Sequence, residues 1–277
     1  MGNNKRTYLL VIFFGLSTYN LRAASRLKID CSFTHWQPYA MKHRDPFFVS
    51  VVKDMGLVVK NLFDWDSFKI VTTAFPLFAA SCMIDDQLQS CFYDPRHHKN
   101  IHQLPAWTHR TADFCIYVPV AALGSLMIVG PTHDLRTAGR IFLAGIPFVW
   151  LGKDVIKQCK TDLNLRPWNE HYSRHKRAYG GFPSGHMAAS IYMTLFFGQR
   201  YGRKFSIPLG ICSAFIGVTY LSGNRHYLSQ LVGGAAWGAL WAYAAGKVVD
   251  HDMKKDYQFN LSLNRQGGPE VGISCKF

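Results

Sequence analysis

Residues 181–186 read Gly-Phe-Pro-Ser-Gly-His and combine a backbone that suits an anion with a side chain that can move a proton. An uncharged stretch follows them, so the sequence predicts a helix that begins within this motif. The first turn of a helix has N–H groups without intrahelical partners and carries the positive end of the helix dipole. Anions bind at such a turn, and Gly185 allows a close approach because it has no Cβ. His186 follows directly and is placed to donate or accept a proton.

Groups upstream and downstream of this motif complete a candidate site. Arg166 precedes Pro167 in a polar stretch, and its guanidinium fork suits a phosphate. His226 lies downstream, and Gln230 follows it by four residues, on the same face of a helix. Phosphoryl transfer needs positive charge on the equatorial oxygens, a nucleophile and a proton for the leaving oxygen. The arginine, the helix start and the two histidines supply these parts.

The order and spacing of these residues resemble the type 2 phosphatidic acid phosphatase and vanadium haloperoxidase superfamily. The pattern of that family is Lys-x6-Arg-Pro, then Pro-Ser-Gly-His, then Ser-Arg-x5-His-x3-Asp. Residues 153 to 235 carry the resemblance. Pro-Ser-Gly-His and Arg-Pro match in full, whereas the first and third motifs match only in part.

The first motif lacks a lysine in register. The position seven residues before Arg166 is Cys159, with Lys160 one residue late and Lys157 two residues early. We expect Lys160 to supply the positive charge that the family takes from its lysine.

The third motif departs from the family twice. Tyr220 stands where the family has arginine, and Gln230 stands where it has aspartate. Arg225, immediately before His226, is expected to restore the missing positive charge. Gln230 is expected to orient the imidazole of His226 by a hydrogen bond, but it cannot supply the negative charge that stabilises imidazolium. A Gln230→Asp change is therefore expected to preserve or raise the rate of an active enzyme.

The resemblance implies a role for each matched residue. His226 would attack phosphorus and form a phosphohistidine, and His186 would protonate the leaving oxygen and then activate water. Arg166 and the N–H groups of Ser184 and Gly185 would hold the phosphoryl oxygens. The expected phosphate-binding residues are Arg166, Ser184, Gly185, Arg225 and Lys160. No metal ion and no cofactor are expected.

These roles imply a phosphatase that hydrolyses a lipid phosphate or another phosphomonoester at the extracytoplasmic face of a membrane. Two alternatives stay open. The departures from the motifs allow a degenerate relative that binds a phosphorylated lipid without turnover. The same oxyanion site would serve a vanadate-dependent haloperoxidase, although the apolar segments count against this alternative.

Six uncharged stretches must position these residues, and they indicate an all-α bundle of about six mostly apolar helices embedded in a membrane. The stretches are 70–84, 114–130, 141–152, 187–199, 205–223 and 227–246. Several are shorter than the ~20 residues that span a bilayer, but their small residues suit close helix packing in lipid. Near the C-terminus, residues 259–264 and 271–277 alternate polar and apolar side chains around Gly267-Gly268, which predicts a small β-hairpin.

The chain divides into four expected parts. Residues 1–24 have a basic start, an apolar run and small residues, the layout of a secretory signal that is either cleaved or kept as an anchor. Residues 25–112 form an N-terminal helical and loop region. The phosphatase-like helical core spans 113–250, and a polar tail follows at 251–277.

Charge indicates the partners and the location. Only 17% of the 277 residues are charged, yet the formal net charge is +14, which favours an anionic partner such as a phosphorylated lipid at a membrane. Nucleic acid is not expected, because the basic residues are scattered and no reading motif accompanies them.

Basic residues between and after the helices set the expected orientation. They are Arg136, Arg140, Arg200, Arg203, Lys204, Lys247, Lys254 and Lys255. By the positive-inside rule these segments are cytoplasmic. We therefore expect a bacterial-type inner membrane protein with its site facing the periplasm, or alternatively a soluble periplasmic protein after signal cleavage. In the membrane, the periplasmic orientation follows if residues 7–20 cross the bilayer and residues 70–84 pack without crossing. If the signal is cleaved and all six later stretches span, the site faces the cytoplasm instead.

Overall fold

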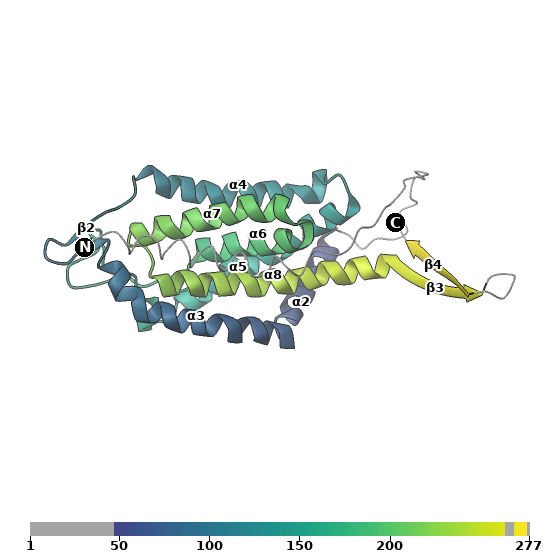
Figure 1. Ribbon diagram of the computed structural model, residues 1–277, viewed down its shortest axis with the longest axis horizontal. Helices are drawn as coiled ribbons and strands as arrows, with labels where there is room; N and C mark the ends of the chain where they lie inside the picture. The colour runs from purple at the N-terminus through teal and green to yellow at the C-terminus, as the bar shows by residue number, and fades with distance from the viewer. Residues whose placement is uncertain (1–46, 264–268, 276–277) are drawn as a thin grey trace.

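Six of seven α-helices lie along one another, and the first crosses them obliquely, in the computed structural model, which describes residues 47–263 and 269–275 (Figure 1). Side chains are described for residues 49–250. The predicted signal segment, residues 1–24, lies outside these ranges. Residues 25–46 and the Gly267-Gly268 turn lie outside them as well.

The helices confirm the all-α bundle that the sequence predicts. Each of the six uncharged stretches overlaps one of the helices α3 to α8, and α2 comes in addition. The bounds are α2 (Phe47–Asn61), α3 (Trp65–Gln89), α4 (Trp107–Val129), α5 (His133–Lys157), α6 (Gly185–Tyr201), α7 (Arg203–Ser222) and α8 (Leu228–Asp256).

Helices α3 to α8 run back and forth along the bundle, so they meet at two ends (Figure 1). At one end, which we call the site end, α3, α5 and α7 finish and α4, α6 and α8 begin. There Gln89 donates a hydrogen bond to the carbonyl of Trp168 at 3.3 Å, and Asp85 accepts one from the N–H of Ser229 at 3.0 Å. We call the opposite end the far end. All three sequence motifs meet at the site end because each lies where one helix stops or the next starts.

The core centres on α6, which packs against α5, α7 and α8. Tyr192 of α6 is fully buried, and its hydroxyl donates to the carbonyl of Phe142 on α5 at 3.1 Å. The ring of Phe142 also lies 5.3 Å from that of Phe197, centroid to centroid. Buried aromatic rings contribute much of the stability of a core. This cluster therefore fixes the middle and last part of α6 against the first half of α5.

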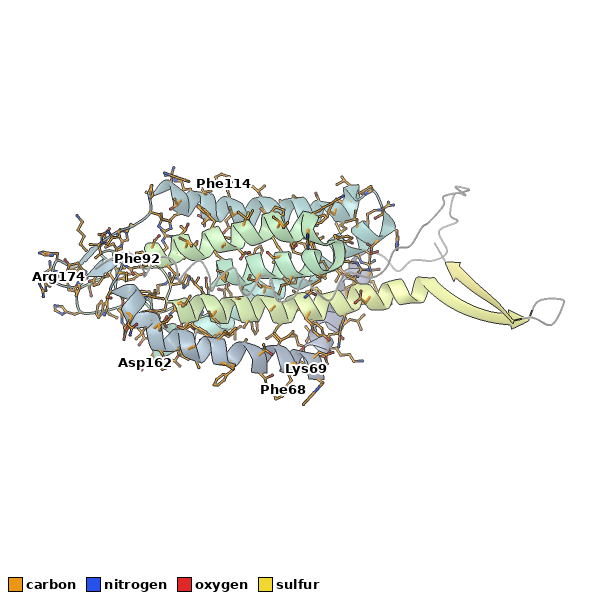
Figure 2. The ribbon with its side chains drawn as sticks, viewed as in Figure 1. Phe68, Lys69, Phe92, Phe114, Asp162 and Arg174 are labelled. Atoms are coloured by element: carbon orange, nitrogen blue, oxygen red, sulfur yellow. The ribbon has the colours of Figure 1, made fainter. Side chains whose placement is uncertain are left out.

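Three helices, α3, α4 and α7, are long and apolar enough to cross a membrane. Only 11%, 22% and 44% of their most apolar segments is buried inside the bundle, so most of this apolar surface needs another partner. Phe68 on α3 and Phe114 on α4 point away from the bundle (Figure 2). These faces indicate association with a membrane. The expectation that residues 70–84 pack without crossing is not supported, because they lie in α3.

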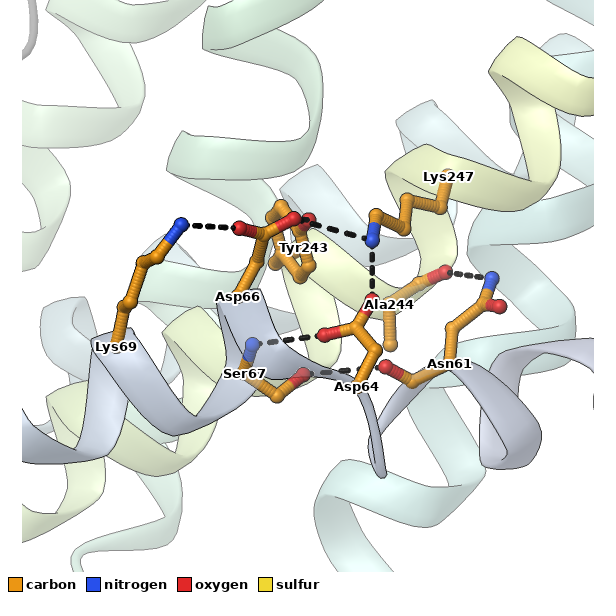
Figure 3. A network of polar contacts seen from close by, with 8 residues as sticks. All are labelled: Asn61, Asp64, Asp66, Ser67, Lys69, Tyr243, Ala244 and Lys247. Atoms are coloured by element: carbon orange, nitrogen blue, oxygen red, sulfur yellow. Dashed lines mark hydrogen bonds and ion pairs between the residues drawn. The ribbon is translucent and has the colours of Figure 1, made fainter.

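Ion pairs tie α3 to α8 at the far end. Lys247 of α8 is paired with Asp64 and Asp66 at the start of α3, and the hydroxyl of Tyr243 donates to Asp66 at 2.5 Å (Figure 3). Asp64 also caps α3, because its carboxylate accepts a hydrogen bond from the N–H of Ser67 at 2.8 Å. Contacts at both ends therefore hold α3 against α8.

A second charged cluster at the far end joins three more helix termini. Arg200 at the end of α6 pairs with Asp134 at the start of α5 at 2.9 Å and with Asp250 of α8 at 2.6 Å. Arg136 and Arg140, which the sequence analysis placed between helices, lie in the first turns of α5 at the same end. Arg136, Arg140 and Arg200 thus lie at the end of the bundle opposite the three motifs.

Two antiparallel hairpins complete the described structure. Strands β1 (Tyr93–Asp94) and β2 (Lys99–Asn100) pair in the segment between α3 and α4. After α8, β3 (Tyr257–Leu263) pairs with β4 (Pro269–Cys275), with Tyr257 opposite Cys275. This pairing confirms the predicted C-terminal hairpin.

Candidate active site

Ser184, which precedes the first turn of α6, offers a hydroxyl and not a backbone N–H to an anion. It is fully buried, and its hydroxyl has no hydrogen-bond partner among the described residues. A buried hydroxyl without a partner is costly unless a ligand or water satisfies it. The N–H of Ser184, which the sequence analysis assigned to the phosphoryl oxygens, donates instead to the carbonyl of Gln230 at 3.0 Å. The hydroxyl is therefore the group that Ser184 has available.

Two lysines of α5 lie near the same helix start. The aliphatic chain of Lys153 packs so closely on Gly185 that a Cβ at this position would collide with it. Lys157 shares a helix face with Lys153, four residues away, and its charge acts on both His186 and His226. In the sequence, Lys157 stands two residues before the position of the family lysine. The spacing of two lysines at the end of an apolar helix was the signal that could have found them.

Lys160, the lysine favoured from the sequence, does not lie on the same helix as Lys153 and Lys157. It is exposed in the segment after α5, and the structure describes no contact between its side chain and the other candidate residues. Its assigned role in phosphate binding stays a prediction. By contrast, the charge of Lys157 acts on both histidines, and Lys153 lies beside Gly185 with its ammonium paired to Asp154.

Arg166 reaches from the loop after α5 to the loop before α8. Its Nη1 donates to the carbonyl of Arg225 at 3.3 Å, and its Nη2 donates to the carbonyl of Gly180 at 3.2 Å. Its own N–H is bound to the carbonyl of Ala178 at 2.9 Å, which fixes the backbone. A guanidinium has five N–H donors, so these side-chain bonds leave donors for an anion.

The side chain of Gln230 ties the start of α8 to the loop that carries Arg166. Gln230 is 1% exposed, and its Nε2 donates to the carbonyls of Leu163 and Leu165 at 3.0 and 2.7 Å. Gly181 must lie beside it, because a Cβ there would collide with the amide. Both N–H groups of the amide are therefore engaged, and its orientation is fixed.

This orientation determines which nitrogen of His226 carries the proton. Because Nε2 of Gln230 donates to two carbonyls, its Oε1 faces His226 and lies 3.2 Å from Nδ1. An amide oxygen only accepts hydrogen bonds, so Nδ1 is protonated. In the neutral ring Nε2 then holds the lone pair. The hydrogen bond expected between these two side chains is present, and it leaves Nε2 with the free lone pair.

His226 is held in its neutral form. It is only 4% exposed, and burial followed by the positive charges of Arg166 and Lys157 keeps its pKa well below the usual range. The hydrogen bond to Gln230 opposes this effect only in part. A neutral imidazole is the form that can attack phosphorus.

Lys157 is expected to give the site a basic limit in pH. Burial, with the nearby charges of Lys153 and Arg166, lowers the pKa of Lys157 to about 8. Raising the pH therefore removes a positive charge from the free site. Because kcat/KM reports the free enzyme, we expect kcat/KM for a phosphomonoester to fall as the pH rises through about 8. The Lys157→Arg variant keeps its charge and should lack this fall, and an identical fall in both proteins would contradict the assignment.

Tyr220 lies between the two histidines, at the position where the family pattern has arginine. Its ring centroid is 4.9 Å from that of His186 and 5.6 Å from that of His226. The guanidinium of Arg225 lies over the same ring, 5.8 Å from its centroid. Arg225 thus brings a positive charge to the edge of the site, while its binding to phosphate stays a prediction.

A carboxylate that the sequence analysis did not identify also reaches the site. Asp113 of α4 has its Oδ1 3.0 Å from Nε2 of His186, and the same oxygen accepts a hydrogen bond from the hydroxyl of Tyr220 at 3.3 Å. No motif marks Asp113 in the sequence. It lies 73 residues from His186 and 107 from Tyr220, so only the packing of the helices brings it here.

Two buried asparagines hold the loops around the site. Oδ1 of Asn164 accepts hydrogen bonds from the N–H groups of Gly180 and Phe182, each at 3.1 Å. Nδ2 of Asn169 donates to the carbonyl of Gly223 at 2.9 Å. These bonds fix the approach to Pro-Ser-Gly-His and the loop before His226 relative to the end of α5.

The charges of the site suit an anion. Lys153, Lys157 and Arg166 gather at one place with a free serine hydroxyl. Within the described part of the chain, no group of three or more His, Cys, Asp or Glu side chains could hold a metal ion. An oxyanion is therefore the ligand that these residues fit.

The family of the chain follows from comparison with known proteins. Residues 141–254 match the model of the PAP2 superfamily. This part of the chain belongs to the PAP2 superfamily. The match runs from α5 to α8 and includes all three motifs, which confirms the resemblance found in the sequence. Searches of curated proteins and of solved structures gave no significant match.

Membership of the PAP2 superfamily supports phosphatase-type activity in general, a phosphate-ester ligand and association with a membrane. The matched region contains every candidate residue of the three motifs. Asp113 lies outside it, on α4.

Proposed function

We propose that this PAP2 protein hydrolyses phosphomonoesters through a phosphohistidine on His226. The observation that carries the proposal is the fixed amide of Gln230, which leaves Nε2 of a buried, neutral His226 unprotonated beside Arg166 and Lys157. A nucleophile within a cluster of positive charges is what attack on a phosphate ester requires.

The reaction has two steps. Nε2 of His226 attacks phosphorus while the bond to the leaving oxygen breaks, and His186 gives its proton to that oxygen. Lys157, Arg166 and the hydroxyl of Ser184 hold the equatorial oxygens. In the second step His186 takes a proton from water as the water attacks the phosphohistidine. Inorganic phosphate leaves, and His226 returns to its neutral form.

A lipid phosphate is the substrate class that the bundle favours. The outward faces of α3, α4 and α7 are apolar, whereas the cations lie where the helices end. A lipid in the surrounding bilayer could keep its chains among these faces while its phosphate reaches the site end. A soluble phosphomonoester would use the same phosphate site without this arrangement.

Phosphate release from a panel of substrates tests the proposal. The full chain in lipid vesicles would be given phosphatidic acid, lysophosphatidic acid, a lipid diphosphate and a soluble sugar phosphate. We expect release from at least one lipid phosphate, at a rate well above that from the sugar phosphate. Release from the sugar phosphate alone would overturn the lipid substrate class, and release from none would overturn the activity.

Binding without turnover is the second candidate. It is favoured by Gln230, which stands where the family has aspartate and supplies no negative charge to His226. In that case the protein would bind vesicles that contain phosphatidic acid, and inorganic phosphate would compete with this binding. No phosphate would be released.

We also propose that the site end faces away from the cytoplasm. Arg136, Arg140, Arg200 and Lys247 all lie toward the far end, which the positive-inside rule assigns to the cytoplasm. If all six helices α3 to α8 cross, the start of α3 and the end of α8 lie on the same side. A crossing by residues 7–20 is then not required for this orientation.

Native cysteines make the orientation testable. Cys159 is exposed near the site end, and a variant that keeps it as the only cysteine should react with a membrane-impermeant maleimide in intact cells. In the same background, a Cys159→Ser, Lys204→Cys variant carries its thiol at the far end and should react only after permeabilisation. The reverse pattern would place the site in the cytoplasm.

A further inference from the structure

We propose that Asp113 is the positioning residue for His186, and that Tyr220 holds Asp113 in place for this role. The inference deepens the proposed function and rests on it. It assigns a role in acid–base catalysis to α4, a helix outside the region that matches the PAP2 superfamily.

The contacts come from three helices that pack together at the site end. Helices α4, α6 and α7 are mutual neighbours, and they carry Asp113, His186 and Tyr220 (Figure 1). One carboxylate oxygen of Asp113 lies 3.0 Å from Nε2 of His186 and 3.3 Å from the hydroxyl of Tyr220. Tyr220 is only 4% exposed, and its ring lies beside that of His186. The imidazole therefore has a packed ring beside it and a carboxylate at one nitrogen.

This contact assigns different tasks to the two nitrogens of His186. A carboxylate accepts hydrogen bonds, so Nε2 keeps its proton and donates it to Asp113. Nδ1 is then the atom that exchanges a proton with the substrate. It gives its proton to the leaving oxygen as the bond from that oxygen to phosphorus breaks, and it takes one from water in the second step. Asp113 keeps its negative charge in both steps and stabilises the imidazolium form.

The surrounding charges explain why His186 needs such a partner. Burial disfavours the charged form of His186, and the charges of Lys157 and Lys153 on α5 act in the same direction, whereas Tyr220 is uncharged. Arg225 lies over the Tyr220 ring. Positive neighbours disfavour the imidazolium that a proton donor must form. Asp113 is the carboxylate in contact with the ring, and it offsets this repulsion.

Tyr220 suits this role better than the arginine of the family pattern. An arginine beside Asp113 would form an ion pair and neutralise much of the carboxylate charge. A tyrosine hydroxyl donates one hydrogen bond and leaves the charge in place. The departure at residue 220 thus keeps Asp113 as a charged partner for His186.

The dependence on the leaving group tests the proposal. An alkyl leaving oxygen must be protonated, whereas p-nitrophenolate leaves without a proton. For Asp113→Asn we expect kcat/KM to fall about 10²-fold with phosphatidic acid and to change only a few-fold with p-nitrophenyl phosphate, as for loss of a proton donor. kcat/KM is the appropriate quantity because it reports the first chemical step and not the later attack of water.

Control variants separate this role from a structural one. Asp250→Asn removes a carboxylate at the far end and should leave both values of kcat/KM unchanged. Tyr220→Phe keeps Asp113 but removes its hydrogen bond. For this variant kcat/KM with phosphatidic acid should fall by less than in Asp113→Asn, and kcat/KM with p-nitrophenyl phosphate should change little. Equal losses on both substrates, or no loss on either, would overturn the proposal.

A titration of His186 tests the role of Asp113 even if the protein shows no turnover. In the full-length protein with labelled histidine, NMR should show that Asp113→Asn lowers the midpoint of the His186 titration by about one pH unit or more. If wild type releases no phosphate from any substrate, the proposed function fails but this shift is still expected. An unchanged midpoint would overturn the role of Asp113 in either case.

Discussion

Replacing His226 with alanine is expected to lower phosphate release by at least about 10⁴-fold, because no other group can form the covalent intermediate. This residue is buried in the structure, 4% exposed. Its removal therefore leaves a cavity as well as removing the nucleophile. Steady-state phosphate release from the preferred lipid phosphate, corrected for folded protein, measures the effect.

Two controls accompany this variant. His226→Gln fills most of the space and should be as inactive as His226→Ala while it unfolds at a temperature closer to that of wild type. His171→Ala removes an exposed histidine from the loop between α5 and α6 and should keep full activity. If His226→Ala hydrolyses lipid phosphates as fast as wild type, His226 is not the nucleophile.

Changing Gln230 to a carboxylate is expected to lower both stability and activity. The sequence alone suggests that Gln230→Asp restores the family pattern and preserves or raises the rate. In the structure, the amide of Gln230 donates to the carbonyls of Leu163 and Leu165, and a carboxylate has no N–H to donate. A carbonyl left without a donor costs about 1–3 kcal/mol when fully buried, and less at these partly buried positions. Aspartate is also shorter and cannot keep all of these contacts.

A pair of variants separates the two tasks of Gln230. Gln230→Glu keeps an acceptor for His226 and loses the donors, so we expect a lower melting temperature with activity retained in part. Gln230→Met loses both, and we expect kcat/KM to fall about 10²- to 10⁴-fold, as when the partner that fixes the tautomer of a catalytic histidine is lost. A melting temperature unchanged in Gln230→Glu would show that the amide does not hold the loop.

The helices and the meeting of the motifs were predictable from local patterns. Each uncharged stretch became a helix because a run of apolar residues of this length buries enough surface when helices pack. Alternating helix directions then bring the ends of α5 and α7 beside the starts of α6 and α8. His186, Arg166 and His226 therefore gather without any further information from the sequence.

The sequence motif did not identify Lys153 and Lys157, because it requires a fixed number of residues between the lysine and Arg-Pro. Here the chain leaves α5 at Lys157 and makes a short 3-10 turn at Asp162–Asn164 before it reaches Arg166. A helix rises by only ~1.5 Å per residue, so spacing in sequence does not translate directly into distance. Helix periodicity at Lys153 and Lys157 was the better guide.

The role of Asp113 and the part of Gln230 in holding the loop could not be predicted from the sequence, because their contacts join residues that are far apart in the chain. Gln230 looks like a lost carboxylate in the sequence, but the carbonyls that need its amide lie 65 and 67 residues away. Tyr220 looks like a lost arginine until Asp113 is seen beside its hydroxyl. Such substitutions are compensated by residues that no local motif contains.

Trapping of the covalent intermediate tests whether His226 is the nucleophile. The full chain in vesicles would be mixed with its preferred lipid phosphate carrying a radiolabelled phosphate, and the reaction would be stopped in alkaline detergent, where phosphohistidine survives. The account predicts a protein-bound label that is stable in base, labile in acid, located on His226 by peptide mapping, and absent from His226→Gln. Rapid phosphate release with no label on His226 would contradict it.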